Sequence, residues 1–165
     1  MLRVLFVCLG NICRSPTADG VFRSMVASAG LSDQVEVDSA GTAAWHIGKT
    51  PDPRTIKAAA ERGYDLSVLR ARQALAADFD QFDYVLAMDL ENLSNLRALK
   101  PATARTDPQL FLRSFARRFN SDEVPDPYYG GADGFEQVLD LVEDGCEGLL
   151  ADIRQRLNQR AKETP

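Results

Sequence analysis

Histidine, tryptophan and cysteine are scarce in this chain, which has one His, one Trp and three Cys among its 165 residues. Three scattered thiols and a single imidazole do not form the ligand set of a zinc site. An odd number of cysteines also argues against a disulfide framework. We therefore expect no metal, reduced cysteines and at least one thiol that is available for chemistry.

Long apolar runs and an excess of basic residues are also missing. The apolar stretch LFVCLG near the start is far shorter than the ~20 residues of a membrane span, and it lacks the flanks of a secretory signal. The formal charge of −5 gives no overall attraction to nucleic acid or to an anionic membrane. We expect a cytoplasmic protein with no nucleic-acid or membrane partner, which must capture any anionic ligand locally.

No linker-like tract, internal repeat or low-complexity segment divides the chain. Hydrophobic residues make up 45% of it and charged residues 26%, which is ordinary for a globular protein. We therefore expect one domain over residues 1–165.

Strand-like and helix-like segments alternate along this domain. Strands are predicted at 3–7, 35–38 and 82–89 and within 102–112, and helices at 16–29, 53–62, 90–99 and after 133. Ser15, Asp52 and Asp133 are predicted as helix N-caps. Such alternation predicts an open parallel α/β sheet with helices on both faces, which binds ligands outside the carboxyl ends of its strands.

The segment CLGNICRS begins where the first predicted strand ends and leads into a helix. Backbone amides and the helix dipole make such a loop an anion site, and Arg14 adds a planar fork suited to two phosphate oxygens. Gly10 and Asn11 can adopt the backbone angles of a tight loop. Cys8 beneath these donors is favoured as a thiolate nucleophile. The plainer alternatives are a core residue, or Cys8 and Cys13 as arms of a metal or disulfide site.

Five segments in this order, CLGNICRSPTA, DSAGT, DLS followed by ARQ, FDYVLAMD and VPDPYYGG, resemble the low-molecular-weight protein tyrosine phosphatase family across nearly the whole chain. The resemblance implies a Rossmann-like, four-stranded parallel sheet in the order 2-1-3-4 with a phosphate-binding loop after the first strand. It also implies hydrolysis of phosphotyrosine and aryl phosphates through a phosphocysteine, without metal or cofactor. Phosphotyrosine proteins are then the substrates, and inorganic phosphate is the product and a competitive ligand.

By matching position, the resemblance implies roles for individual residues. Cys8 attacks phosphorus, Arg14 binds the equatorial oxygens, and Asp126 is the general acid. A general acid is needed because the phenol of tyrosine has a pKa near 10. The residues that bind phosphate or support the loop are Leu9, Gly10, Asn11, Ile12, Cys13, Ser15 and Ser39.

The chain departs from the family pattern at one place. The family commonly has a histidine just after the serine of the DLS segment, where Val68 and Leu69 follow Ser67 in this chain. Bracing of the loop is therefore expected to be weaker or achieved differently. Asp89, which ends the third predicted strand, is expected to orient Arg14 or to close the site.

Aromatic residues complete the expected pocket. The resemblance implies Trp45, Tyr128 and Tyr129 as its walls, which would make it deep enough for phosphotyrosine. A Trp45 that only packs its own loop is the alternative. Tyr129 is a surface residue, a wall residue or a site for a tyrosine kinase. His46 is expected at the rim rather than in catalysis.

Two cysteines and a basic cluster have open roles. Cys13 either forms a protective disulfide with Cys8 under oxidation or fills space beneath the loop. Cys146 falls on an apolar helical stripe and is expected in the core. The arginines 113, 117 and 118 either attract acidic phosphopeptides or form a solvated face.

Two other functions compete with the phosphatase. An arsenate reductase of the same fold needs further redox-active cysteines near the third strand, and QALAADFDQFDYVLAMD contains none. A phosphate-binding module without catalysis is the other alternative, but a nucleophile, an arginine and an acid together argue against it.

Overall fold

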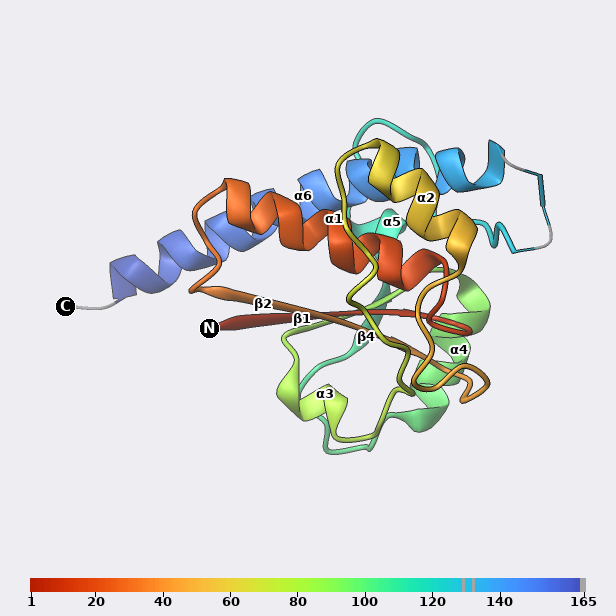
Figure 1. Ribbon diagram of the computed structural model, residues 1–165. Coiled ribbons are helices and arrows are strands. Elements are labelled where there is room, and N and C mark those ends of the chain that lie inside the picture. The colour runs from red at the N-terminus through yellow and green to blue at the C-terminus, as the bar shows by residue number, and fades with distance from the viewer. Residues whose placement is uncertain (129, 132, 164–165) are drawn as a thin grey trace.

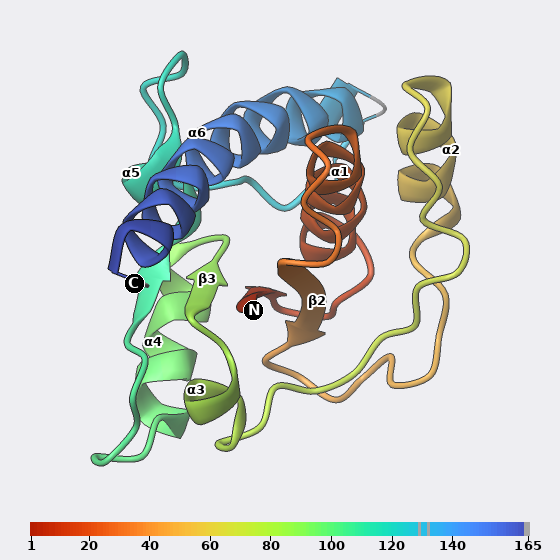
Figure 2. The same cartoon turned by 90° about the vertical axis from the view of Figure 1, so that its left-hand side faces the viewer.

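The computed structural model describes residues 1–128, 130–131 and 133–163, and its centre is a four-stranded parallel sheet (Figures 1 and 2). The strand order is β2-β1-β3-β4. The strands are β1 (Leu2–Cys8), β2 (Val35–Gly41), β3 (Tyr84–Ala87) and β4 (Pro108–Leu110). Cys8 pairs with Gly41, and Val7 with Ala87, so the carboxyl ends of the three longer strands meet at one edge. The expected fold class is confirmed.

Helices cover both faces of the sheet, as expected. The helices are α1 (Arg14–Ser28), α2 (Pro53–Glu61), α3 (Asp78–Gln81), α4 (Leu90–Leu99), α5 (Phe111–Phe115) and α6 (Asp133–Glu163). In Figure 1, α1, α2, α5 and α6 lie on one side of the sheet, and α3 and α4 lie on the other. Successive side chains of a strand point to opposite faces, and Phe6 and Val7 accordingly belong to two separate apolar cores. The central strand is therefore buried on both sides.

Some predicted boundaries are wrong. Helix α1 begins at Arg14 with Cys13 in the N-cap position, because the hydroxyl of Ser15 bonds the loop instead of capping the helix. Helix α6 includes Asp133, so this residue lies in the first turn. The third strand is half as long as predicted because the chain turns after Met88, and Asp89 caps α4. Asp52 caps α2 as predicted.

Helices α3 and α5 were not predicted, because four or five residues are too few to show helical periodicity. The segment between α2 and α3 is not helical, and its backbone joins the sheet through a parallel bridge between Gly41 and Gln73. This crossover segment, residues 62–77, therefore lies beside the carboxyl end of β2.

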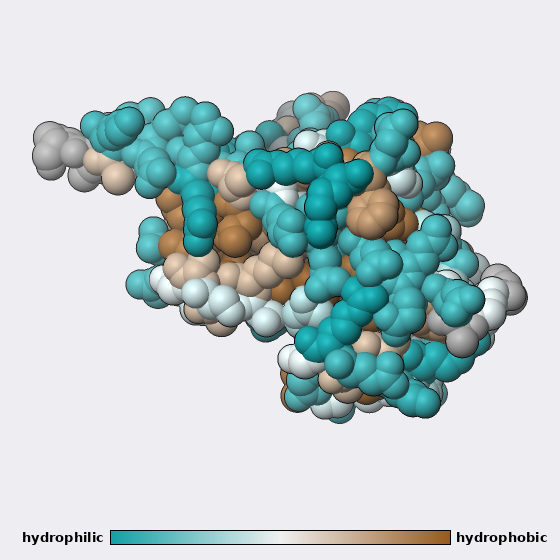
Figure 3. Space-filling model, turned by 90° about the horizontal axis from the view of Figure 1, so that it is seen from above, coloured by the Kyte–Doolittle hydropathy of each residue, from teal (hydrophilic) through white to brown (hydrophobic). Residues whose placement is uncertain are grey.

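The C-terminal part of α6 projects beyond the sheet, and its surface is largely hydrophilic (Figures 1 and 3). Among the described residues, no helix combines the length and the apolar character that a membrane crossing requires.

Candidate active site

The loop between β1 and α1 forms the floor of a pocket of about 120 Å³ at the carboxyl edge of the sheet. The lining residues are Cys8, Leu9, Gly10, Ile12, Cys13, Arg14, Trp45, His46, Asp126 and Tyr128. Segments from three distant parts of the sequence therefore meet here. Asn11, Ser15 and Ser39 are buried behind the pocket, and Tyr129 lies outside the described residues.

The backbone of the loop is arranged to bind an anion. The amides from Leu9 to Cys13 have no hydrogen-bond acceptor among the described residues. Asn11 has a φ of 57°, the left-handed conformation that asparagine tolerates better than most residues. Gly10 does not have a positive φ. It is small for another reason, because a Cβ there would lie 3.0 Å from Cδ2 of His46.

A chain of buried polar groups leads away from the thiol of Cys8, which is 3% exposed. Its Sγ lies 3.0 Å from Oγ of Ser15, which accepts a hydrogen bond from Nδ2 of Asn11 at 2.8 Å. The same amide donates to Oγ of Ser39 at 3.1 Å. Ser39 in turn bonds the carboxylate of Asp19. Since Oγ of Ser15 already accepts from Asn11, its own proton is available to a thiolate at Cys8.

Asp19 is a buried acid, 1% exposed, that our sequence analysis did not single out. Burial raises its pKa, and this effect outweighs the lowering by Arg23 and by the hydroxyl of Ser39. Its ion pair with Arg23 is local, four residues further along α1, but its contact with Ser39 on β2, twenty residues away, has no signal in the sequence.

Arg14 is almost fully buried beside the thiol. Its Nη1 donates to Oδ2 of Asp89 at 2.6 Å and to the carbonyl of Val124 at 3.0 Å, so Asp89 has the expected contact. Nη2 lies 3.9 Å from a carboxylate oxygen of Asp126. Burial alone would lower the pKa of Arg14, but the negative charges of Cys8, Asp89 and Asp126 outweigh it and raise the pKa. Arg14 therefore stays charged at every working pH.

Asp126 stands at the mouth of the pocket, and its side chain is 38% exposed. Its Oδ1 accepts a hydrogen bond from the amide of Tyr128 at 3.0 Å. The guanidinium of Arg54 lies 5.4 Å from the ring centroid of Tyr128 and also bonds the carboxylate of Asp52. Helix α2 thus supports this wall through Arg54, a residue that the sequence analysis missed.

The opposite rim is formed by the loop after β2. Trp45 is 71% exposed and lines the pocket, so it is not a residue that merely packs its own loop. His46 lines the pocket beside Gly10, consistent with a place at the rim. Two partly exposed aromatic side chains, those of Trp45 and Tyr128, thus line the pocket.

The three cysteines are free, and their surroundings differ. Burial raises the pKa of the Cys13 thiol to about 12. A hydrogen bond with Thr55 lowers this pKa, and the negative charge of Asp52 raises it further. Burial also raises the pKa of Cys146, which lies on the buried face of α6 in the core, as predicted. Only Cys8 and Cys13 belong to the pocket.

The side chains that replace the expected histidine do not brace the loop. Val68 is 73% exposed, and Leu69 packs against the apolar core. The backbone amide of Arg72 instead donates to Oδ1 of Asn11 at 3.0 Å. Arg72 belongs to the ARQ motif, but the sequence assigned it no role.

The basic cluster faces acidic neighbours rather than the pocket. Arg113 pairs with Asp122, and Arg118 pairs with Glu147 and Asp144. These pairs satisfy part of the positive charge, which fits a solvated face.

A parallel α/β sheet that holds a buried thiol beneath a loop of free amides, with an arginine and a carboxylate at the same pocket, defines a cysteine-dependent phosphatase. The family model described as low molecular weight phosphotyrosine protein phosphatase matches residues 3–161. The chain therefore belongs to this family.

Individual relatives agree with this assignment. A low molecular weight protein-tyrosine-phosphatase of Streptomyces coelicolor is 48% identical over 161 residues, which cover 96% of this chain and 98% of that protein. A phosphotyrosine phosphatase of Schizosaccharomyces pombe is 45% identical, covering 92% and 97%. The crystal structure of a protein tyrosine phosphatase from Entamoeba histolytica superposes with a TM-score of 0.89 at 38% identity, covering 94% and 98%. These relatives do not favour the arsenate reductase alternative.

Proposed function

We propose that Cys8, Arg14 and Asp126 together hydrolyse phosphotyrosine in proteins. The observation that carries this proposal is that all three side chains line one pocket, above a loop whose amides are free. The protein is a cysteine-dependent hydrolase by family, and phosphoproteins are the substrates that the family implies.

The first step transfers the phosphoryl group to the enzyme. Sγ of Cys8 attacks phosphorus as the thiolate, the bond from phosphorus to the phenolic oxygen breaks, and Asp126 gives its proton to that oxygen. In the second step water attacks the phosphocysteine, Asp126 takes a proton from it, and the sulfur leaves as a thiolate. Inorganic phosphate is the product, and it competes for the same loop.

Charge on the phosphoryl oxygens is stabilised by groups already in place. The loop amides and the fork of Arg14 contact these oxygens, so little reorganisation is needed during the reaction. Ser15 donates to the sulfur when it leaves. Ser39 supports this arrangement through its bond from Asn11.

The walls select an aromatic substrate. Trp45 and Tyr128 flank the phenyl ring, and the apolar side chain of Ile12 lies on the floor. Tyr129 is proposed as a further wall residue, with a surface position or modification by a tyrosine kinase as the alternatives. A protein that depends on a reduced thiol suits the cytoplasm.

Cys13 is proposed as the redox partner of Cys8. A peroxide oxidises the Cys8 thiolate to the sulfenic acid and is reduced to water or an alcohol; attack of the Cys13 sulfur with loss of water then forms a disulfide, which two external thiols reduce again. With a pKa of about 12, Cys13 attacks slowly near neutral pH.

Hydrolysis of p-nitrophenyl phosphate and of a phosphotyrosine peptide, both with a chelator present, tests the catalytic roles. Cys8→Ser should abolish turnover. Asp126→Asn should lower kcat on the peptide by roughly 10²–10⁴-fold, and less on the nitrophenyl ester, whose leaving group needs less protonation. Asp122→Asn, an exposed carboxylate paired with Arg113, is the control and should leave kcat unchanged.

Each outcome has a distinct meaning. Normal turnover by Cys8→Ser would refute the nucleophile, and full peptide activity of Asp126→Asn would remove the acid assignment. Arsenate reduction with a thiol donor, in the absence of phosphatase turnover, would favour the reductase.

A further inference from the structure

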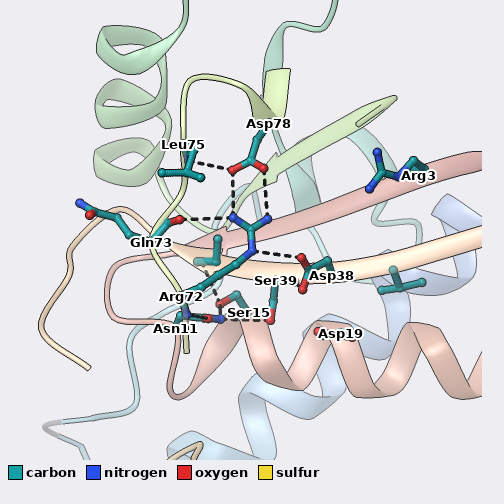
Figure 4. Close-up of polar contacts among 12 residues, drawn as sticks. Arg3, Asn11, Ser15, Asp19, Asp38, Ser39, Arg72, Gln73, Leu75 and Asp78 are labelled. Atoms are coloured by element: carbon teal, nitrogen blue, oxygen red, sulfur yellow. Dashed lines mark hydrogen bonds and ion pairs between the residues drawn. The ribbon is translucent and has the colours of Figure 1, made fainter. Parts of the chain in front are cut away.

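Arg72 is clamped by two carboxylates that belong to different elements (Figure 4). Its Nε donates to Asp38 in the middle of β2 at 3.0 Å. Its two Nη atoms donate to the two oxygens of Asp78 in α3 at 3.1 and 3.2 Å. One oxygen of Asp78 also accepts from the amide of Leu75 at 2.8 Å. These four hydrogen bonds therefore fix where the crossover segment passes β2.

The pair between Arg72 and Asp78 is the buried part of this clamp and has a defined geometry. Asp78 is 4% exposed, and a bidentate pair of arginine and carboxylate is directional. Burial alone would lower the pKa of Arg72, but Asp78 and Asp38 outweigh it and raise the pKa.

The backbone of Arg72 uses this position to hold the loop. Its carbonyl accepts from the amide of Gly41 at 2.8 Å, and its own amide donates to Oδ1 of Asn11 at 3.0 Å. If the Asn11 amide were turned over, its NH₂ group would face the N–H of Arg72, and two donors would meet. The Arg72 amide therefore selects the orientation in which Asn11 donates to Ser15 and Ser39.

That orientation decides where the proton of Ser15 goes. Because Oγ accepts from Asn11, its single proton is left for Sγ of Cys8 at 3.0 Å or for the carbonyl of Ala40 at 3.3 Å. The negative thiolate is the stronger acceptor of the two.

We propose that Arg72 is a positioning residue for the nucleophile: its clamp on Asp38 and Asp78 holds its amide where it orients Asn11, and Asn11 thereby directs the Ser15 proton onto Cys8. This inference rests on the proposed roles of Cys8 and Ser15. Arg72 touches neither the substrate nor the reacting atoms.

The test is the rate of iodoacetamide alkylation of Cys8 as a function of pH, which needs no turnover. In Arg72→Met the midpoint of this profile should move to higher pH, and alkylation at pH 6 should slow roughly tenfold, as expected for about one pH unit. The phosphocysteine should also break down more slowly, so kcat should fall while KM changes less than about twofold.

Arg62→Met is the matched control. Arg62 also lies between several carboxylates, those of Glu136, Asp140 and Glu143, and its side chain is 26% exposed against 30% for Arg72. It joins α2 to α6 away from the loop. Both variants should lose stability in urea, but only Arg72→Met should shift the alkylation profile.

Asp78→Asn distinguishes the loss of the clamp from the electrostatic effect of changing one charge near Cys8. It is also the variant to use if Arg72→Met does not fold. Removing a negative charge would by itself favour the thiolate and move the profile to lower pH. Loosening the clamp moves it to higher pH, which is the result that we expect.

Profiles of Arg72→Met and Asp78→Asn that match the wild type, or a shift of Asp78→Asn to lower pH, would overturn the proposal. If Cys8→Ser retained turnover, the proposed catalysis would fail, but the alkylation profiles would still decide the role of Arg72.

Discussion

Oδ2 of Asp89 lies 2.6 Å from Nη1 of Arg14, while Oδ1 of the same carboxylate accepts a hydrogen bond from the amide of Asn92 at 2.8 Å. A single side chain therefore caps helix α4 and orients the arginine of the phosphate loop. The end of β3 is thereby coupled to the loop after β1, although the two residues are 75 positions apart.

The two tasks of Asp89 can be separated by substitution. Asparagine is as good an N-cap as aspartate, but it lacks the charge that holds the buried Arg14. Asp89→Asn should therefore keep the helix cap, and it should lower kcat/KM by roughly tenfold or more because a charge-assisted bond is lost. Asp89→Ala should lose in addition about 1 kcal/mol of unfolding free energy. Urea unfolding measures the stability and aryl phosphate kinetics measure kcat/KM. If Asp89→Asn and Asp89→Ala were equally stable, Asp89 would not stabilise α4 as its N-cap.

The sheet, the loop, Cys8 and Arg14 could be predicted from the sequence because their signals are local, whereas Asp126 was predicted from the family resemblance alone. A buried apolar run, a cysteine that follows it and a proline-containing helix start lie within twenty residues. The supporting contacts have no such signal. Arg72 meets Asn11 across 61 positions and Asp38 across 34, and only the folded crossover brings them together.

Ser15 shows how a local rule fails at a functional site. Its place before a proline predicts an N-cap, which the structure contradicts. The tertiary contacts with Cys8 and Asn11 use the hydroxyl instead. The local preference of Ser15 for capping the helix therefore competes with its hydrogen bonds in the site, and the latter prevail.

Alkylation of the folded protein should modify a single cysteine. With a pKa of about 12, only about one Cys13 in 10⁵ is a thiolate at pH 7, and Cys146 is fully buried with its pKa raised further. Mass spectrometry after brief iodoacetamide treatment should find the label on Cys8, and inorganic phosphate should slow the reaction. Cys8→Ser should take up no label in the same time. Label on Cys13 in the wild type would contradict this.

Asp144 of α6 should make stability depend on pH. Burial alone would raise its pKa, but hydrogen bonds from the amides of Phe119, Arg117 and Arg118 outweigh it and lower the pKa. A lowered pKa in the folded state stabilises the protein above the ordinary value of 3.8, and this contribution is lost as pH falls through the folded-state pKa. Asp144→Asn should cost about 2 kcal/mol at pH 7.

The difference between wild type and Asp144→Asn should shrink in urea unfolding as the pH is lowered from 5 toward 3. Asp33→Asn, in the exposed turn before β2, serves as a comparison for the general effect of removing one charge. A difference that stays constant with pH would mean that Asp144 acts through its shape alone.

Gly148 allows helix α6 to pack closely against the end of helix α5. A Cβ there would collide with the backbone carbonyl of Phe115 at the end of α5, and backbone cannot move aside as a side chain can. Alanine is the better helix former by about 1 kcal/mol, but overpacking of this kind costs typically 1–3 kcal/mol or more. Gly148→Ala should therefore lower the unfolding free energy despite its propensity.

The matched control for Gly148 is Gly134 of the same helix, where a Cβ would lie 3.4 Å from Cβ of Pro127, an ordinary contact. Gly134→Ala should be neutral or stabilising by up to about 1 kcal/mol, since propensity alone acts there. Urea unfolding of both variants decides between packing and propensity. If Gly148→Ala were as stable as Gly134→Ala, α6 would not rest on the Phe115 carbonyl, and the packing of α5 against α6 would have to be looser than the structure shows.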